Sequence, residues 1–570
     1  MEKIVKIYNK LVIAALATVV AFATSCTDYL TIIPSDKIVH ENFWQNEDEV
    51  NGMLATAYYK LISNDAIQKA IIWGELRSDN MTYPTSNNKN IKYIVEANIL
   101  EDNEFCKWNI YYEAINYANL VMEYAPLVLD RDPDFTEEDL KIVTGEMLAL
   151  RALSHFYLVR SFRDIPLALV PAVNDSELPE YAQVHPMKAL NSIMDDLDRA
   201  ENMVVPSGSY ADAANRTKNF GRITKNAVLA MKADVNLWRA AFATYYEGGD
   251  YAKPGDAQKY YDMCIQNCQD VIDNMDRKLE EEWNKSNTPV VRYPYNLLQN
   301  DFNEDDPTAK DSEVYDEIFG YGNSRETIFE LQADRNTQNG GVKAMYGNNG
   351  NPGMVMVPST FLSKNYTVDD LRAYSYTNAK NLNGTGDGNT ELCIVKYAAK
   401  SSPSFNYREN DVFDANWIVY RRTDVLLMKA EALVARQSAS ANDLSEAFDI
   451  VKAINTRSRM DTTNISRPLN PDSYRTAEAA LDLVMKERLL ELSYEGKRWY
   501  DLVRKALREK STNGILFVAD KLTNNASVVK TKMSSIDGLF FPIHSDELKF
   551  NKLLKQNPAY KKEGGSAEMN

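Results

Sequence analysis

Apolar residues spaced three and four positions apart predict long helices toward both ends of the chain. Thr136 and Asp139 have the spacing of a capping box, which marks the start of a helix. The apolar stripe that follows is formed by Leu140, Val143, Met147, Leu150, Ser154 and Tyr157. A second stripe, between Arg222 and Phe242, consists mostly of small residues: Ala227, Ala230, Ala233, Leu237 and Ala241. Small side chains let a neighbouring helix approach closely, so this helix is expected to pack against others.

The same periodicity predicts several more helices, spaced so that antiparallel pairs can stack. The small-residue pattern recurs in Val425, Met428, Ala432 and Ala435. The other helices are expected near 47–62, 108–124, 187–202, 257–275, 443–457 and 474–495. A strict period of about 34 residues is absent, so any tetratricopeptide-like repeats must be degenerate. The pattern predicts a mostly α-helical fold.

The middle of the chain, from about 278 to 416, has a different texture. Asn, Gly, Asp, Pro and Tyr are frequent there, as in NTPVVRYPYNLLQNDFNEDDP and MYGNNGNPGM. Turn-forming residues at this density interrupt helices. Long loops in a compact protein are usually functional or disordered, and aromatic residues are unusual in disordered segments. We therefore expect a loop-rich face carried by a helical scaffold.

The first 25 residues have the layout of an export signal. Lysines precede an apolar stretch over 11–23 that is too short to cross about 30 Å of hydrocarbon comfortably. Small residues then lead into Cys26 in the run ATSC, which is similar to a bacterial lipobox. Cleavage there would make Cys26 the lipidated first residue, and its acyl chains would hold the protein at a membrane. A plain secretory signal is the alternative.

The composition is that of an ordinary globular protein, with 570 residues, 44% hydrophobic and 25% charged. Its formal net charge is -17, and acidic residues are spread along most of the chain. This charge argues against nucleic acid as a partner, because few basic residues are available to replace the counterions of phosphates.

The cysteines and histidines do not form a recognisable metal site or catalytic motif. Cys264 and Cys268 lie on one predicted helix face and are expected to be buried thiols, and none of the four His residues lies near a cysteine. GxSxG and GxxxxGK[ST] motifs are absent as well. Residues 301–305 alternate like the start of an EF-hand, but Asp306 replaces its glycine, so the segment is interpreted as a solvated acidic loop. No metal and no cofactor are expected.

Several sequence blocks, in their order along the chain, resemble one protein family. TDYLTIIPSDKI and FWQNEDEVNGMLATAY follow Cys26. Four further blocks are GRITKNAVLAMKADVNLW from Gly221, YRRTDVLLMKAEALV from Tyr420, ERLLELSYEGKRWYDL from Glu487 and FFPIHSDELKFNKLLKQNPAY from Phe540. Together they span the mature chain to Tyr560 and resemble the SusD/RagB family of outer-membrane glycan-binding lipoproteins.

Most residues of these blocks are interpreted as scaffold. Large aromatic residues at helical spacing are usually core, and this applies to Trp44, Trp108, Trp238, Trp417 and Trp499. Arg488 and Glu491 are expected to form an ion pair on a helix surface. The chain departs from the family pattern at Thr423, where an aromatic residue is usual, and at 163–164, where Arg and Asp replace a glycine turn.

The resemblance implies a mostly α, SusD-like scaffold with about four tetratricopeptide-like helix pairs and a loop-rich ligand-binding part. The expected organisation is a lipoprotein signal peptide over 1–25, a lipidated tether over 26–40 and one SusD-like domain over 41–570. Within that domain, the scaffold is expected at about 41–276 and 417–510, the loop-rich insert at about 277–416 and a C-terminal segment at 511–570.

The resemblance also implies a function without covalent chemistry. Such a protein binds oligosaccharide or polysaccharide and delivers it to a SusC-like TonB-dependent outer-membrane transporter. Its contact with the membrane would be the N-terminal lipid anchor. Asp28, close to Cys26, fits the orientation of such lipoproteins toward the cell exterior.

The resemblance implies that the sugar site draws on a loop after the second helical segment and on the mid-chain loops. Sugar capture requires flat apolar faces and planar polar groups, and Tyr and Trp provide both. The 33 Tyr outnumber the 19 Phe and 7 Trp taken together, which favours aromatic side chains that remain partly exposed to solvent. The ligand-binding residues are therefore expected to be Arg77, Asp79, Asn80, Tyr83, Tyr93, Trp283, Tyr293, Tyr295 and Tyr346.

Two other classes of function stay open at this point. A secreted all-helical glycoside hydrolase would need two carboxyl groups about 5 to 9.5 Å apart, and the sequence singles out no such pair. A helical-repeat scaffold that binds only protein partners would use the loop aromatics as an interface.

Overall fold

The computed structural model describes residues 43–85, 87–173, 180–210, 215–285, 292–300, 313–334, 336–347, 352–383, 391–397, 400–401, 406–407, 413–460 and 465–561. The expected signal peptide, Cys26 and the tether over 26–40 lie outside these residues, as does the acidic segment 301–305. Across the described residues the fold is mostly α-helical, as the sequence predicts.

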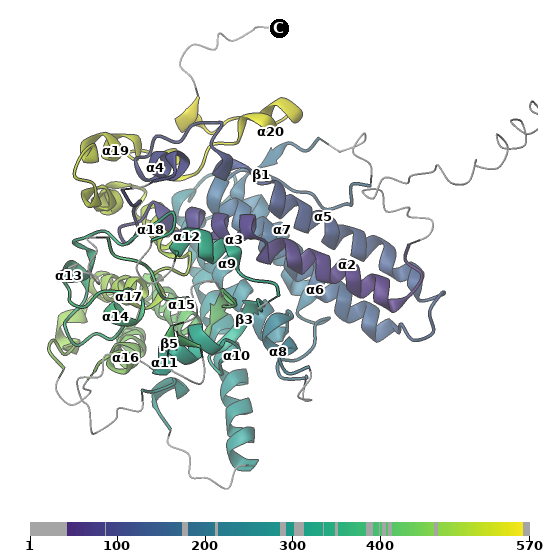
Figure 1. Cartoon of the computed structure of the whole chain (residues 1–570), viewed down its shortest axis with the longest axis horizontal. Helices are drawn as coiled ribbons and strands as arrows, with labels where there is room; N and C mark the ends of the chain where they lie inside the picture. The colour runs from purple at the N-terminus through teal and green to yellow at the C-terminus, as the bar shows by residue number, and fades with distance from the viewer. Residues whose placement is uncertain are drawn as a thin grey trace, which may run out of the picture.

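Helices of the first half pack one upon the next across the molecule (Figure 1). They are α2 Glu47–Ile62, α3 Asn64–Ile71, α4 Lys89–Val95, α5 Asn109–Tyr124, α6 Glu137–Phe162, α7 Pro186–Ala200, α8 Lys218–Gly221, α9 Lys225–Tyr245 and α10 Asp256–Lys285. α2 contacts α5, α5 contacts α6, α6 contacts α7, α7 contacts α9, and α9 lies along α10. This serial packing is typical of stacked helix pairs.

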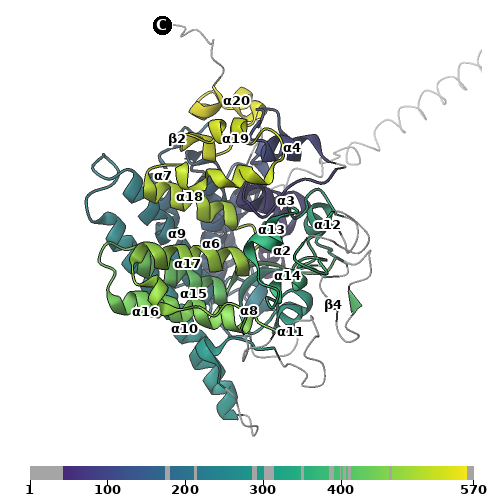
Figure 2. The same ribbon diagram turned by 90° about the vertical axis from the view of Figure 1, so that its left-hand side faces the viewer.

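The second half continues the stack and then closes one end of it. Its helices are α15 Arg422–Ala435, α16 Ala441–Arg457, α17 Ala477–Leu492, α18 Arg498–Glu509, α19 Ala526–Lys532 and α20 Ser545–Phe550. α15 contacts α10, and α16 and α17 both pack on α15, while α18 returns to α9. α19 and α20 lie at the same end of the molecule as α4 (Figures 1 and 2).

The helices predicted from apolar periodicity are present, with small shifts at their ends. The helix expected near 257–275 extends further, to Lys285. The predicted core positions are confirmed, since Trp44, Trp238 and Trp499 are at most 2% exposed and the small residues of α9 are buried. α3 has only eight residues and follows α2 after the single residue Ser63, so it is too short to give a separate periodic signal.

α6 begins as predicted but is buried on more than one face. The Thr136 hydroxyl accepts the Asp139 N–H at 3.2 Å, and the Asp139 carboxylate accepts the Thr136 N–H at 3.0 Å, which confirms the capping box. Every residue from Gly145 to Phe162 is buried, because α5, α7 and other helices surround this part. The helix is long and apolar enough to span a membrane, yet its most apolar stretch is 83% buried within the protein.

The structure contains a two-stranded antiparallel sheet that the sequence does not predict. β3 Thr327–Leu331 pairs with β6 Trp417–Arg421, and Leu331 lies opposite Trp417. All residues of both strands are buried. Short strands that are buried on both faces lack the alternation of apolar and polar residues by which strands are recognised.

The segment between 277 and 416 contains more regular structure than the loop-rich face expected there. It carries β3 and the short helices α11 Glu313–Tyr315, α12 Gly340–Tyr346, α13 Phe361–Asn365 and α14 Arg372–Ser375. Its aromatic residues form a cluster in which Tyr397 stacks on Trp417 at 5.2 Å and meets Phe319 edge-on at 5.3 Å. Many tyrosines are therefore core residues here, contrary to the expectation that they stay partly wet.

Glu491 is the centre of a buried ionic network. Its carboxylate accepts hydrogen bonds from Arg457 at 2.6 Å, Arg421 at 2.8 Å and Arg372 at 3.2 Å, and all four side chains are 0% exposed. The network joins α17, α16, β6 and α14. The predicted surface ion pair between Arg488 and Glu491 is wrong, because neighbouring elements cover α17 and turn both side chains inward.

Arg488 instead belongs to a second buried network. It contacts Asp501 at 2.9 Å and Asp424 at 3.2 Å. Arg504 then joins Asp501 to Glu431, with both contacts at 2.7 Å. These bonds fix α15, α17 and α18 relative to one another.

Both departures from the family pattern are accommodated locally. Arg163 ends α6 with a φ of 67°, the left-handed region that favours glycine, and its guanidinium pairs with Asp164 and Asp537. Thr423 is fully buried, and its hydroxyl accepts a hydrogen bond from Arg421.

Replacing Glu491 with Gln should strongly destabilise the protein. Burial alone would raise the pKa of Glu491, but its arginine partners hold that pKa well below its usual range. The substitution keeps the side-chain shape and leaves three buried guanidinium groups short of negative charge. We expect the free energy of unfolding, measured by urea denaturation, to fall by about 3–5 kcal/mol.

The matched control is Glu123→Gln on the exposed surface of α5, which should change the free energy of unfolding by at most about 0.5 kcal/mol. A loss below about 1 kcal/mol for Glu491→Gln would contradict the role assigned to the network.

Candidate functional site

Arg77 lies inside the fold, although the sequence predicts that it contacts ligand. It is 3% exposed, and its guanidinium donates to the backbone oxygens of 538 and 539 at 2.6 and 2.8 Å. The same group lies 4.5 Å from the ring centre of Trp499. Nearby, Asp79 is partly buried and accepts a hydrogen bond from Arg498 at 2.9 Å. Arg77 therefore links the first loop to the C-terminal segment and does not belong to a surface site.

Asn80 and Tyr346 are also internal. Asn80 is 0% exposed and donates to the Glu75 carboxylate at 2.5 Å. Tyr346 is 1% exposed, and its hydroxyl donates to the backbone oxygen of Tyr494 at 2.8 Å. Glu75 also accepts the Tyr494 N–H at 2.6 Å, while burial raises the pKa of Glu75 to about 7. These residues hold the turn after α17 in place, and the side chains of Asn80 and Tyr346 lie inside the fold.

Tyr93 lies on α4 and Tyr83 shortly before it, and both are partly exposed. The Tyr83 hydroxyl donates to Glu96 at 2.8 Å, and burial together with this carboxylate raises its pKa to about 12. The Lys92 ammonium lies 5.9 Å from the Tyr83 ring centre, and Lys89 lies 5.3 Å from that of Tyr93. Both rings keep some accessible surface, but a lysine is already close to each of them.

Trp283, Tyr293 and Tyr295 lie near the end of α10. The Arg292 guanidinium lies 5.4 Å from the ring centre of Trp283, and Tyr293 is 40% exposed. Tyr295 is half-buried, and burial raises its pKa to about 12. This end of α10 and α4 lie at opposite ends of the molecule in both views (Figures 1 and 2). The predicted residues therefore do not form one site.

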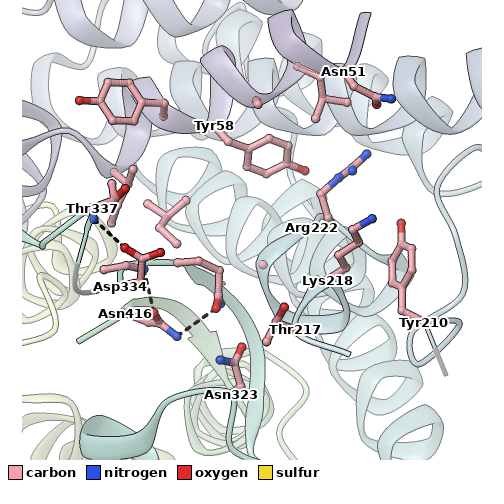
Figure 3. Close-up of a pocket in the computed structure, with 18 of the residues that line it drawn as sticks. Asn51, Tyr58, Tyr210, Thr217, Lys218, Arg222, Asn323, Asp334, Thr337 and Asn416 are labelled. Carbon is pink, nitrogen blue, oxygen red and sulfur yellow. Dashed lines mark hydrogen bonds between the residues drawn. The ribbon is translucent and has the colours of Figure 1, made fainter. Parts of the chain in front are cut away.

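A large cavity, with a volume of about 1290 Å³, lies elsewhere in the fold. α2, the start of α6, the segment around α8 and the residues after β3 surround it. Figure 3 shows Asn51, Tyr58, Arg222 and Lys218 on one side and Asp334 and Asn416 on the other. Its lining also includes Tyr59, Phe135, Asp139, Tyr210, Asn323, Gln332, Thr337 and Asp414.

Buried bonds fix one wall of this cavity. The Tyr58 hydroxyl donates to Glu146 at 2.6 Å and accepts the Ile223 N–H at 2.9 Å. Arg222 binds Glu146 with two hydrogen bonds of 2.6 Å, and Glu146 itself is fully buried. Burial and the Glu146 charge hold the pKa of Tyr58 well above its usual range. The Tyr58 ring is thus pre-positioned beside the cavity.

The opposite wall presents amide and carboxylate groups. Asn416 accepts the Ala333 N–H at 2.8 Å and donates to Gln332 at 3.3 Å. Asp334 accepts the backbone N–H groups of Asn336 and Thr337 at 2.7 and 2.6 Å. These planar groups are held by the backbone that follows β3 and precedes β6, so their positions depend on the central sheet.

A second cavity of about 710 Å³ adjoins the first, because Tyr210 and Asn323 line both. Asn219 binds the backbone of Tyr210 through hydrogen bonds of 2.8 and 3.1 Å. Arg325 connects the second cavity to a smaller one of about 380 Å³, which Tyr293 also lines. We call these three adjoining cavities the groove. Tyr293 is thus one sequence-predicted residue that the structure brings to it.

The groove combines the two features that recognition of a polyol requires. Exposed aromatic faces come from Tyr59, which is 57% exposed, and from the half-buried Tyr58 and Tyr210. Amide and carboxylate groups beside them can pair with hydroxyls. Sequence reasoning missed these residues because they come from distant segments. The one signal in the sequence is that Tyr58 and Arg222 fall within the family-like blocks, most of whose residues are interpreted as scaffold.

Among the described residues, neither the cysteines nor the possible metal ligands form a further candidate site. Cys106, Cys264, Cys268 and Cys393 are buried free thiols, as expected for Cys264 and Cys268. Within the described ranges, no group of three or more His, Cys, Asp and Glu residues is arranged to hold a metal ion.

Two family models match the chain in separate parts. The model described as "Starch-binding associating with outer membrane" matches residues 28–237, and the SusD family model matches residues 359–560. SusD-like protein P38 of Formosa agariphila is 24% identical over 560 residues, covering 94% of this chain and 96% of that protein. SusD-like protein P2 of the same organism is 23% identical over 420 residues, covering 70% of each.

Solved structures with the same fold are also found. A SusD superfamily protein from Bacteroides thetaiotaomicron has a TM-score of 0.64 at 18% identity, covering 91% of this chain and 99% of its own. A SusD superfamily protein from Parabacteroides distasonis has a TM-score of 0.62 at 21% identity, covering 90% and 99%. With the family models at both ends and a relative matched over nearly its full length, the chain belongs to the SusD-like family.

Proposed function

We propose that this protein binds oligosaccharide or polysaccharide in the groove, without catalysis, and delivers it to a SusC-like TonB-dependent transporter. The observation that carries the proposal is that one large cavity has tyrosine rings on one side and amide and carboxylate groups on the other (Figure 3). Membership of a family with a starch-binding, outer-membrane description supports it. The transporter and the step of delivery come from the family resemblance.

The groove suits a sugar because few of its side chains have to become ordered when the sugar binds. Tyr58 and Arg222 are held by Glu146, and Asn416 is held by the backbone of residue 333. A few stacking and hydroxyl contacts, less the cost of ordering a flexible glycan, give a Kd of about micromolar to millimolar. Repeated units along a polysaccharide would raise the apparent affinity through avidity.

Tyr83, Tyr93, Trp283 and Tyr295 also reach the surface, and sugar contacts at these four residues form an alternative proposal. Tyr83 and Tyr93 do not line the groove. Trp283, whose ring centre lies 5.4 Å from the Arg292 guanidinium, and Tyr295 are close to Tyr293 at one end of it. A glycan held in the groove needs none of the α4 residues. This separation allows the two locations to be tested independently.

The protein would be held at the outer membrane by acyl chains on Cys26. Residues 26–40 would then act as a tether between the lipid and the folded domain. With a net charge of -17, the protein gains no attraction to an anionic lipid surface, so the anchor must supply the membrane affinity.

The first experiment is affinity electrophoresis of the soluble protein, starting after Cys26, in gels that contain different polysaccharides. Retardation by at least one glycan, with no release of reducing ends, is the expected result. Release of reducing ends would favour a glycoside hydrolase instead. Absence of retardation by every glycan would favour a scaffold that binds only proteins.

Tyr59→Ala should weaken binding of the retarding glycan by about fivefold, because stacking on one aromatic ring contributes about 1 kcal/mol. Tyr251→Ala is the matched control, since Tyr251 is 52% exposed and does not line the groove. Affinity is measured by calorimetry or by retardation at several glycan concentrations. Weakening by Tyr83→Ala and Tyr93→Ala, with Tyr59→Ala unchanged, would place the site beside α4 and contradict the proposal.

Cys26→Ser should abolish lipid attachment. Cells grown with an alkyne-labelled fatty acid are expected to label the unaltered protein and not the variant, and the variant should move from the membrane fraction to the soluble fraction. Equal labelling of both proteins would contradict the assignment of Cys26. Export of both proteins with no labelling of either would favour a plain secretory signal.

A further inference from the structure

We propose that the glycan taken by the groove is anionic and that its carboxylate or sulfate groups bind in the second cavity. This inference rests on the proposed function, because it names the ligand class of the same groove. Two adjoining cavities of the groove differ in the charge of the side chains that line them.

The second cavity is basic, although the chain as a whole carries a net charge of -17. Its acidic lining residues are Glu281 and Glu282. Its basic lining residues are Arg216, Lys225, Arg277, Lys278, Lys285 and Arg325. A concave surface lined mainly by one sign of charge concentrates its field and attracts the opposite charge.

Most of these basic side chains have no ion-pair partner among the residues that the structure describes. Lys225 lies 3.5 Å from Glu201. For Arg216, Arg277, Lys278 and Arg325, no carboxylate among the described residues lies within the 4.0 Å of an ion pair. Lys232, further along α9, shows the contrast, because it contacts both Asp198 and Glu201 at 2.7 Å. Within the described part of the chain, four cations at the cavity are thus left without a carboxylate partner, and an anionic ligand could supply one.

The cations come from elements that the fold holds around one space. Arg277, Lys278 and Lys285 lie on the last turns of α10, Arg325 precedes β3, and Arg216 precedes α8. Gly208 makes room for one of them: a Cβ at this position would lie 2.6 Å from the Lys278 Nζ atom. The φ of +86° at Gly208 also suits glycine. The Lys278 ammonium therefore packs directly against the cavity wall.

The first cavity has the opposite character. Glu47, Asp139, Asp334 and Asp414 line it. Of its two basic lining residues, Arg222 is already paired with Glu146, and the Lys218 ammonium lies 5.8 Å from the ring centre of Tyr210. Acidic groups of a ligand are disfavoured there by repulsion, whereas neutral sugar hydroxyls can pair with the carboxylates and amides. A chain that carries neutral units in the first cavity and acidic units in the second fits both.

The test compares three named polymers: polygalacturonate for carboxylates, dextran sulfate for sulfates, and amylopectin as the neutral glycan. The variant is the double substitution Arg277→Gln and Lys278→Gln. The control is Lys552→Gln with Lys555→Gln, which removes the same charge from exposed positions near α20, at the other end of the molecule. Binding is followed by affinity electrophoresis and calorimetry.

We expect the unaltered protein to bind polygalacturonate or dextran sulfate, and the two arms show which anionic group is preferred. The groove variant should bind that polymer about tenfold more weakly, which is about 1.4 kcal/mol, and the control should bind as the unaltered protein does. Raising salt from about 0.1 M to about 1 M shortens the Debye length from about 10 Å to about 3 Å and should weaken binding further.

Three outcomes would overturn the inference. Binding of amylopectin alone would leave the proposed function standing and show that the glycan is neutral. Equal weakening in the groove variant and the control would show attraction to charge in general and no site. Retention of none of these polymers, nor of any other glycan in the panel, would remove the proposed function together with this inference.

Discussion

The buried carboxylate of Glu491 is the constraint on which the rest of the structure depends. Removing one charge from water is costly, and only its contacts with Arg421, Arg457 and Arg372 offset that cost. Arg457 also contacts Glu326 at 2.7 Å, directly before β3. Because β3 and β6 lead into the residues that form one wall of the groove, the network fixes that wall as well as the helices around it.

The sequence predicts the helical scaffold well, because helices repeat their apolar residues at short spacing. The capping box at Thr136 and the core position of Trp238 are predictable from the pattern of neighbouring residues along the chain. The sheet of β3 and β6 depends on pairing between distant segments, and its fully buried strands lack alternation. The inward orientation of Glu491 depends on elements that cover α17, which no local pattern reports.

The candidate site was less predictable for the same reason. Tyr346 looks like a loop aromatic in the sequence but lies in the core, where its hydroxyl reaches a backbone oxygen. Tyr58 looks like scaffold on α2 but lines the groove. Whether a tyrosine is exposed to solvent depends on which elements pack against it. The groove itself combines α2, α8 and the ends of two strands, so its residues are neighbours only after folding.

The central claim is that ligand binds in the groove and not beside α4. Hydrogen-exchange mass spectrometry measures this directly, with and without the polysaccharide that retards the protein. The account predicts slower exchange in peptides from 47–62, 215–225 and 323–334 when the glycan is bound. Slower exchange confined to peptides from 83–96, with those three regions unchanged, would contradict it.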